Sequence, residues 1–176
     1  MKTPIFLVLY TFSVTAFTQE MVSPIVKGFG AIYALPDAAE NPDPTLKYQI
    51  VIDLKSGTPD ASAVNPALNN IARMLNLHGA GGVENDNIKV VGVIHNMATH
   101  SILTNAAYQE KYEMDNPNIP LIKALKDAGV ELFVCGQSMV ARGVANEDLN
   151  PDIVKSISAL TVMTTYQMRG YKPLVF

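Results

Sequence analysis

The 176-residue chain contains a single cysteine, Cys135, so a monomer cannot form an internal disulfide bond. It also lacks any run of basic residues, and 13 Lys and Arg against 16 Asp and Glu give a formal net charge of -3. This distribution does not favour binding to nucleic acid or to anionic lipid. Low-complexity tracts are absent, and hydrophobic residues make up 48% of the chain. The sequence therefore predicts one folded domain with a substantial core.

The N-terminal residues have the layout of a secretory signal peptide. A lysine near the start precedes a largely apolar stretch, Ile5–Phe17, and Ala16 and Thr18 fit the small-residue pattern before a cleavage site. The apolar stretch is shorter than the roughly 20 residues that a transmembrane helix needs. We therefore expect residues 1–18 to be a signal peptide, with a periplasmic or secreted location and no membrane attachment after cleavage. A buried N-terminal strand or a retained anchor is the alternative.

Prolines are frequent in the segment that follows. Residues 19–46 contain Pro24, Pro36, Pro42 and Pro44. Because proline lacks the N–H group that regular elements use, we expect an irregular arm that packs on the domain. Within it, the pattern VKGFGAIYALPDA could add a short edge strand.

Strand and helix patterns alternate from residue 47 onward. The predicted strands are residues 47–54, 88–96, 130–136, 153–157 and the final YKPLVF; the predicted helices are residues 65–78, 118–129 and 158–170, with a short helical turn at QSMVARGV and a loop at residues 146–151. The nearly unbroken apolar run IKVVGVIHN is typical of a strand buried on both faces. The alternation predicts an α/β domain with a mostly parallel sheet.

Two reactive side chains follow predicted strands directly. His95 comes after VVGVI, and Cys135 comes after ELFV. Ligands of parallel sheets bind beyond the carboxyl ends of the strands, so both residues would face one crevice if their strands are neighbours. The thiolate is the reactive form of cysteine, and N–H groups of a helical turn after Cys135 would favour it. His95 could hydrogen-bond that thiolate or shuttle its proton.

Each of these residues also has a purely structural interpretation. Cys135 could be a small apolar core residue, and His95 could cap its strand through backbone contacts. Gln137 and Ser138 could donate hydrogen bonds to a bound sulfur or anion, or could simply cap the next turn. Arg142 lies about two helical turns beyond Cys135, so it could assist only if the loop folds back.

Three segments resemble the DsrE/DsrF-like family of small sulfur-relay proteins: VIHNMATHSILTNAAY, NPNIPLIKALKDAGVELFVCGQSMVARG and LTVMTTYQMRGY. The CGQS context is the most specific part. The resemblance covers residues 47–176 as one domain, and the preceding segment KGFGAIYALPDAAENPDP looks like the N-terminal arm of a secreted branch. It implies a flavodoxin-like, open, mostly parallel sheet with helices on both faces, and a homo-oligomer, either a trimer or a hexamer.

The resemblance also implies a function. In sulfur-relay members a cysteine after a strand carries persulfide sulfur between proteins, and Cys135 falls on that position, while His95 matches a recurrent histidine. The implied role is thiol-based sulfur handling or redox chemistry, with a sulfur donor or acceptor protein or a small sulfur species as partner. Whether the chain is an enzyme stays open. Well-studied relay members work in the cytoplasm, so an exported chain departs from them. The expected binding residues are Gly136, Gln137, Ser138 and Arg142.

Other classes of site have weaker support. His78, His95, His100 and Cys135 can each ligate zinc or copper, but no CxxC or HxxxH motif occurs, so no metal site is predicted. HGAGG lacks the GxxxxGK[ST] pattern and follows a helix, so no nucleotide or other cofactor is predicted. A cysteine hydrolase would need a third residue to orient His95, and the sequence does not reveal one.

Two alternatives to sulfur transfer stay open. The crevice could bind a small anion or a partner's tail without catalysis. The chain could also serve chiefly as an oligomer building block, with Tyr108, Tyr112 and Tyr166 as interface anchors, since tyrosine is enriched at interfaces.

Overall fold

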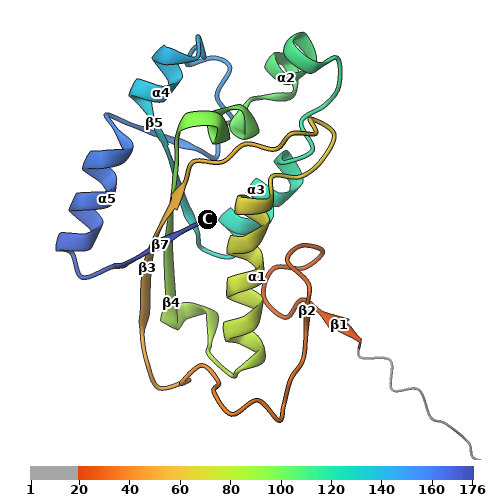
Figure 1. The fold of residues 1–176 in the computed structure, drawn as a ribbon, viewed down its shortest axis with the longest axis vertical. Helices are drawn as coiled ribbons and strands as arrows, with labels where there is room; N and C mark the ends of the chain where they lie inside the picture. Colours follow the sequence, from red (N-terminus) through yellow and green to blue (C-terminus); the bar gives the residue numbers. More distant parts are fainter. Residues whose placement is uncertain (1–19) are drawn as a thin grey trace, which may run out of the picture.

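A five-stranded sheet organises the fold, which the computed structural model describes for residues 20–176. Every neighbouring pair is parallel, and the order is β6-β5-β4-β3-β7 (Figure 1). The strands are β3 (Tyr48–Leu54), β4 (Ile88–Ile94), β5 (Glu131–Cys135), β6 (Val154–Ser156) and β7 (Lys172–Val175). All five predicted strands are thus confirmed. The predicted signal peptide, residues 1–18, lies outside the described residues.

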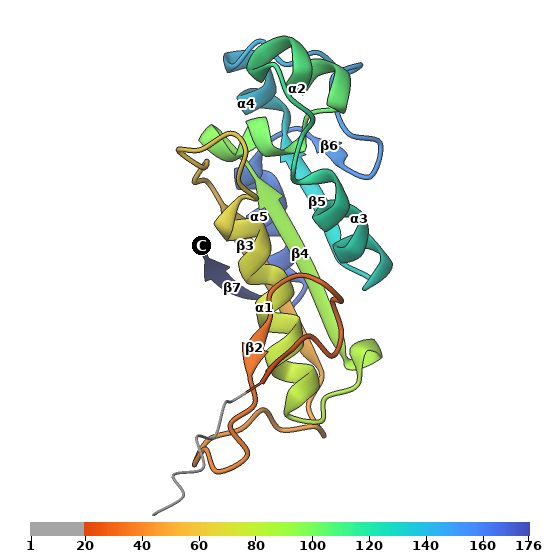
Figure 2. The ribbon, with the colours of Figure 1, turned by 90° about the vertical axis from the view of Figure 1, so that its right-hand side faces the viewer.

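Helices cover both faces of this sheet. They are α1 (Pro66–Ala80), α2 (Asn105–Tyr112), α3 (Ile119–Asp127), α4 (Gly136–Ala141) and α5 (Ala159–Met168), with 3-10 turns η1 (Asn85–Asn87) and η2 (Asn96–Ile102). Figure 2 looks onto the face covered by α1 and α3, with α5 behind the sheet. The predicted open, flavodoxin-like α/β fold is therefore confirmed. None of the described helices has the length and apolarity to cross a membrane.

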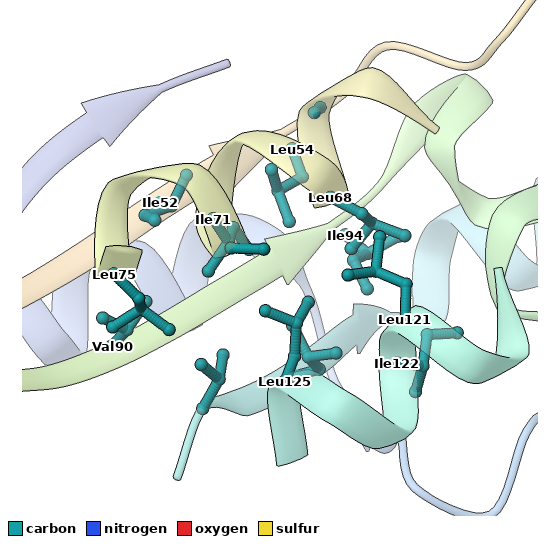
Figure 3. Close-up of a cluster of buried hydrophobic side chains, with 14 of the residues drawn as sticks. Ile52, Leu54, Leu68, Ile71, Leu75, Val90, Ile94, Leu121, Ile122 and Leu125 are labelled. Atoms are coloured by element: carbon teal, nitrogen blue, oxygen red, sulfur yellow. The ribbon is translucent and has the colours of Figure 1, made fainter. Parts of the chain in front are cut away.

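The strand residues alternate between two buried clusters, as the two-residue period of a strand requires. Ile52, Leu54, Val90 and Ile94 pack with α1 and α3 in the larger cluster (Figure 3). The residues between them pack with α5 in the smaller cluster. That smaller cluster contains Val51, Val91, Val93, Cys135, Ala159 and Val162. Cys135 therefore lies on the face of the sheet that α5 covers.

The N-terminal arm is held against α1 by one buried side chain. Asn76 accepts hydrogen bonds from the N–H groups of Ile25 at 2.9 Å and Val26 at 2.8 Å, and it donates to the carbonyl of Phe29 at 2.9 Å. The predicted strand in the arm exists as β2 (Ile32–Tyr33), but it pairs with β1 (Met21–Val22) in a separate two-stranded sheet rather than at an edge of the main sheet.

Buried asparagines fix the connections at the carboxyl end of the sheet. Asn65 caps α1 by accepting from Ala67 N–H at 2.8 Å, as its position before Pro66 predicts. Its side chain also donates to Ser101 Oγ at 2.8 Å, and its own N–H donates to Asn118 Oδ1 at 2.7 Å. The starts of α1 and α3 and the end of η2 are thereby tied together. This network gives the loops beyond the strands a fixed frame.

Candidate functional site

The two predicted site residues follow neighbouring strands. β4 pairs with β5 in parallel, and Ile94 lies opposite Val134 in the register. His95 and Cys135 are the next residues along the two strands. Ile94 and Val134 pack in the larger cluster with α1 and α3, so the residues that follow them lie on the side of the sheet that α5 covers. The expectation that their strands are adjacent is confirmed. Both residues stand at the carboxyl edge, where open α/β sheets bind ligands.

Cys135 is largely enclosed, with 4% of its surface exposed. It ends β5 and occupies the N-cap position of α4, while Ala159 and Val162 of α5 pack over it. The side chain is a free thiol. The thiol therefore lies beneath the start of α5.

Polar groups nevertheless surround the sulfur. Burial raises the pKa of the Cys135 thiol, but the N–H of Ala159, the hydroxyl and N–H of Ser138 and the N–H of Gln137 together lower the pKa below its usual value. Cys135 is the N-cap residue of α4, but its sulfur accepts no capping hydrogen bond from the first turn of that helix. Ala159 was missed in the sequence because it lies 24 residues from Cys135 and only the packing of α5 brings it near.

Ser138 and Arg142 both bind the residue after His95. The Asn96 N–H donates to Ser138 Oγ at 3.1 Å. Arg142 donates from Nε to the Asn96 carbonyl at 2.5 Å and from its guanidinium to Asn96 Oδ1. Asn96 has a φ of 51°, a left-handed conformation that asparagine tolerates better than most residues. Arg142 thus folds back toward η2, and its hydrogen bonds go to Asn96 rather than to Cys135.

Gly136 and Gln137 both face the chain that follows β6. A Cβ on Gly136 would lie 2.7 Å from the Ser156 carbonyl oxygen, so the close backbone approach there requires glycine. Gln137 reaches the Ile157 carbonyl with Nε2 at 3.5 Å, a long hydrogen bond. The Gln137 side chain therefore points along the surface, whereas its backbone N–H acts on the sulfur.

His95 has a carboxylate partner that the sequence did not reveal. Its Nε2 lies 2.5 Å from Asp53 Oδ1, and each side chain is 26% exposed. Asp53 is the one charged residue in the apolar strand YQIVIDL, and a charge in such a strand could have indicated a functional residue. The pair lies on the α5 side of the sheet, where a fixed histidine can accept or donate a proton.

The remaining histidines bind elsewhere. Nδ1 of His78 is 2.8 Å from the Met74 carbonyl, and Nδ1 of His100 is 2.9 Å from the Tyr112 hydroxyl. Within residues 20–176, no three metal-ligating side chains gather. Tyr108 is 2% exposed and donates to the Ala61 carbonyl at 2.7 Å, so its predicted role as a surface anchor is wrong.

An apolar patch adjoins the thiol. We use this name for Val140, Ile157 and Leu160, which are 79%, 78% and 78% exposed. Val140 belongs to α4, Ile157 precedes α5 and Leu160 lies in its first turn, and Gln137 of α4 contacts the Ile157 carbonyl. Exposed aliphatic side chains grouped in this way indicate a contact surface.

The sheet and its strand-end thiol define a small α/β protein built around one cysteine. The model of the DsrE/DsrF-like family matches residues 48–176, and the chain belongs to this family. Family membership supports a sulfur-relay-like kind of role. No curated protein matches the sequence at a significant level.

Two solved structures share the fold at low sequence identity. One is the protein of unknown function MTH1491 from Methanobacterium thermoautotrophicum, with a TM-score of 0.56 and 16% identity. The other is the ychN protein from E. coli, with a TM-score of 0.54 and 17% identity. Each alignment covers 73% of this chain and 99% of the other chain. At these identities the likeness shows the architecture alone.

Proposed function

We propose that this chain is an exported sulfur carrier that holds sulfane sulfur on Cys135. The observation that carries the proposal is the set of donors around the sulfur. The N–H groups of Ala159, Ser138 and Gln137, with the Ser138 hydroxyl, outweigh burial and lower the pKa of the thiol. A thiol that is inert core packing needs no such donors, whereas a thiolate or persulfide anion does.

The proposed loading step is a simple displacement. The Cys135 thiolate attacks a sulfane sulfur of a polysulfide, forms a new S–S bond and breaks one S–S bond of the donor. The leaving group is a polysulfide shortened by one sulfur, so no external oxidant or reductant is needed. The donors at the start of α4 then stabilise the terminal persulfide anion, and transfer to an acceptor reverses the same chemistry.

Loading also requires a path to the sulfur. Cys135 is 4% exposed, and Ala159 at the start of α5 packs over it. The neighbouring Ile157 and Leu160 are among the most exposed apolar side chains of the described residues. We place the entrance here, between α4 and the start of α5, opened by local movement of that segment or by a docking partner.

His95 and Asp53 complete the proposed site. Asp53 fixes the imidazole through Nε2, which leaves Nδ1 available for proton exchange. In this role His95 accepts the thiol proton during loading and returns it after unloading. Arg142 and Asn96 hold the η2 turn that follows His95, so they position it rather than touch the sulfur.

Mass spectrometry after incubation with polysulfide tests the carrier function directly. We expect a mass gain of one sulfur atom, removable by dithiothreitol and absent in Cys135→Ser. Thiol alkylation across a pH series gives a second readout, with a midpoint below that of free cysteine. Alkylation only after denaturation, together with no sulfur gain, would rule the proposal out.

Export is a separate part of the proposal. It is supported by the charged start and short apolar stretch of residues 1–18. Mass spectrometry of the protein recovered from the periplasm or medium should show an N-terminus near Gln19. Recovery of an intact Met1 in the cytoplasm would contradict it.

A second candidate is a non-catalytic, oligomeric binding module. The enclosure of Cys135 and the apolar patch favour it, because a sealed thiol beside an exposed aliphatic surface suits assembly better than turnover. The occupant of the patch in this case is a second copy of the chain, in a trimer or hexamer. Sulfur gain by wild type but not by Cys135→Ser separates the two candidates.

A further inference from the structure

A cavity is lined by residues of η2, α2 and the segment after α4. Helices α2 and α4 lie at the same end of the molecule (Figure 1). The cavity measures about 360 Å³, and its lining includes three basic side chains, His100, Lys111 and Arg142. They come from η2, α2 and the end of α4, so three separate segments bring them together. Cys135 and His95 do not line this cavity.

Lys111 and Arg142 form no direct ion pair at this cavity, as far as the described residues show. Glu110 and Asp148 line it too, yet neither Lys111 nor Arg142 forms an ion pair in the described part of the chain. Asp148 accepts instead from the Ala145 N–H at 3.1 Å. Because no carboxylate pairs directly with Lys111 or Arg142, both can interact with a negative ligand in the cavity.

Arg142 is held in a fixed orientation. Its Nε and one terminal nitrogen donate to Asn96, which leaves the other terminal nitrogen free to donate to a ligand. Lys111 lies beside the Tyr112 ring, with Nζ 5.7 Å from the ring centroid. Both cations are thus positioned by neighbouring groups before a ligand arrives, which limits the entropy lost on binding.

His100 adds a third donor. Tyr112 has no other hydrogen-bond partner among the described residues, so the satisfied arrangement has its hydroxyl donating to His100 Nδ1. Nε2 then carries the ring proton and can donate it. Burial, and then the positive charges of Lys111 and Arg142, lower the pKa of His100, which shows that both cations act on this ring.

We propose that this cavity binds a small oxyanion through Lys111, Arg142 and His100. An anion with several acceptor oxygens, such as sulfate or thiosulfate, matches donors that converge from three directions. The site is independent of the proposed persulfide chemistry, because Cys135 contributes no group to it. Cys135→Ser should therefore bind the anion like wild type.

Calorimetric titration with sodium sulfate, at constant ionic strength maintained with chloride, tests the proposal on the purified full chain. We expect saturable binding at one site. Lys111→Gln should weaken it about tenfold, the loss that one charge-assisted hydrogen bond accounts for. Lys89→Gln, at an exposed lysine near the amino end of the central strand β4 and outside the cavity lining, should leave binding unchanged. Absence of saturable binding by wild type, or equal binding by Lys111→Gln, would overturn the proposal.

Proton linkage provides an independent readout. A bound anion favours the charged imidazole, so saturating sulfate should raise the pKa of His100 when its ring protons are followed by NMR. The groups facing this ring are Tyr112, Lys111, Arg142, Glu110 and Asp148. Binding should accordingly tighten as the pH falls. A titration curve of His100 that sulfate does not move would contradict the site.

A parallel titration with thiosulfate identifies the ligand class. Equal affinity for sulfate and thiosulfate assigns a general oxyanion site. Tighter binding of thiosulfate, lost again in Lys111→Gln, assigns a sulfur oxyanion as the preferred ligand. Either result supports the site.

Discussion

Asp53 and His95 form a side-chain pair across neighbouring strands, with Oδ1 and Nε2 2.5 Å apart. The pair stands at the carboxyl ends of β3 and β4, one strand away from Cys135. A carboxylate that orients an imidazole is a common arrangement where a histidine exchanges protons. Asp53 is therefore the residue that orients His95, which the sequence alone did not reveal.

Replacing Asp53 with Asn should slow sulfur loading of Cys135 and change its pH dependence, because His95 loses its orienting partner. Both side chains are about a quarter exposed (26% each), so we expect unfolding in urea to show a loss below about 1 kcal/mol. The matched control is Asp152→Asn, which breaks the pair of the same length, 2.5 Å, between Lys126 at the end of α3 and the residue two before β6. If both variants load sulfur at the wild-type rate, the proposed role of the pair is wrong.

Replacing Ser138 with Ala should raise the pKa of Cys135 toward its usual value, because the hydroxyl is one of the donors that lower it. The folded-state pKa of the thiol is depressed, so its ionisation stabilises the fold increasingly as the pH rises through that pKa. The contribution is complete above the unfolded-state pKa and absent below the folded-state pKa. Urea unfolding across this pH window should show the rise in wild type and lack it in Cys135→Ser. An alkylation midpoint unchanged in Ser138→Ala would contradict the assignment.

Replacing Asn76 with Ala should release the N-terminal arm. The variant leaves the N–H groups of Ile25 and Val26 without their buried acceptor, which costs about 2–4 kcal/mol. Limited proteolysis should then cleave at Lys27 faster than in wild type. Asn69→Ala is the comparison: Asn69 Oδ1 also holds the arm, but through one hydrogen bond, from Gly30 N–H at 2.9 Å, so cleavage should be accelerated less than in Asn76→Ala. Equal protease resistance in Asn76→Ala and wild type would show that the arm has another anchor.

Two glycines of the arm should respond differently to alanine. Both have positive φ, +57° at Gly30 and +80° at Gly28, but a Cβ on Gly30 would lie 2.2 Å from the Arg73 backbone nitrogen. Nothing lies within 4 Å of a Cβ on Gly28. Thermal unfolding should therefore show a loss of about 1 kcal/mol for Gly28→Ala and about 3 kcal/mol or more for Gly30→Ala. Similar losses in both would mean that the arm moves away from α1 at little cost.

Replacing Leu160 with Asp should reduce assembly if the apolar patch joins two copies. Leu160 is 78% exposed, so the folded monomer should tolerate the charge while an apolar contact should not. Sedimentation velocity should show an oligomer for wild type and a smaller species for the variant. Leu46→Asp, in the arm and 52% exposed, should leave the sedimentation unchanged. A monomeric wild-type protein at micromolar concentration would exclude the patch as a homo-oligomer contact.

Most of the architecture could be predicted because its elements carry strong periodic patterns. The alternation in KYQIVIDL and the spacing of Leu68, Ile71 and Leu75 place β3 and α1 within a residue or two of their observed bounds. Helix α2 was not predicted, since Tyr108 is its one buried residue and the rest of NAAYQEKY gives no apolar stripe. The pairing of β1 with β2 depends on contacts between the arm and α1, which local sequence does not encode.

The site was predicted in part. Cys135 and His95 could be placed because each directly follows a strong strand pattern. Asp53, Asn96 and Ala159 could not, since their roles arise from strand register and from the packing of α5. The interpretation of Arg142 as a binding residue for the thiol's ligand gains no support from its contacts, because the folded-back turn directs it to Asn96.

The sheet order has a consequence for biosynthesis. The final strand, β7, lies beside β3, which is the first strand of the sheet to be made. One side of β3 therefore stays unpaired while more than a hundred intervening residues are translated, and its backbone donors and acceptors are open to other chains throughout that time.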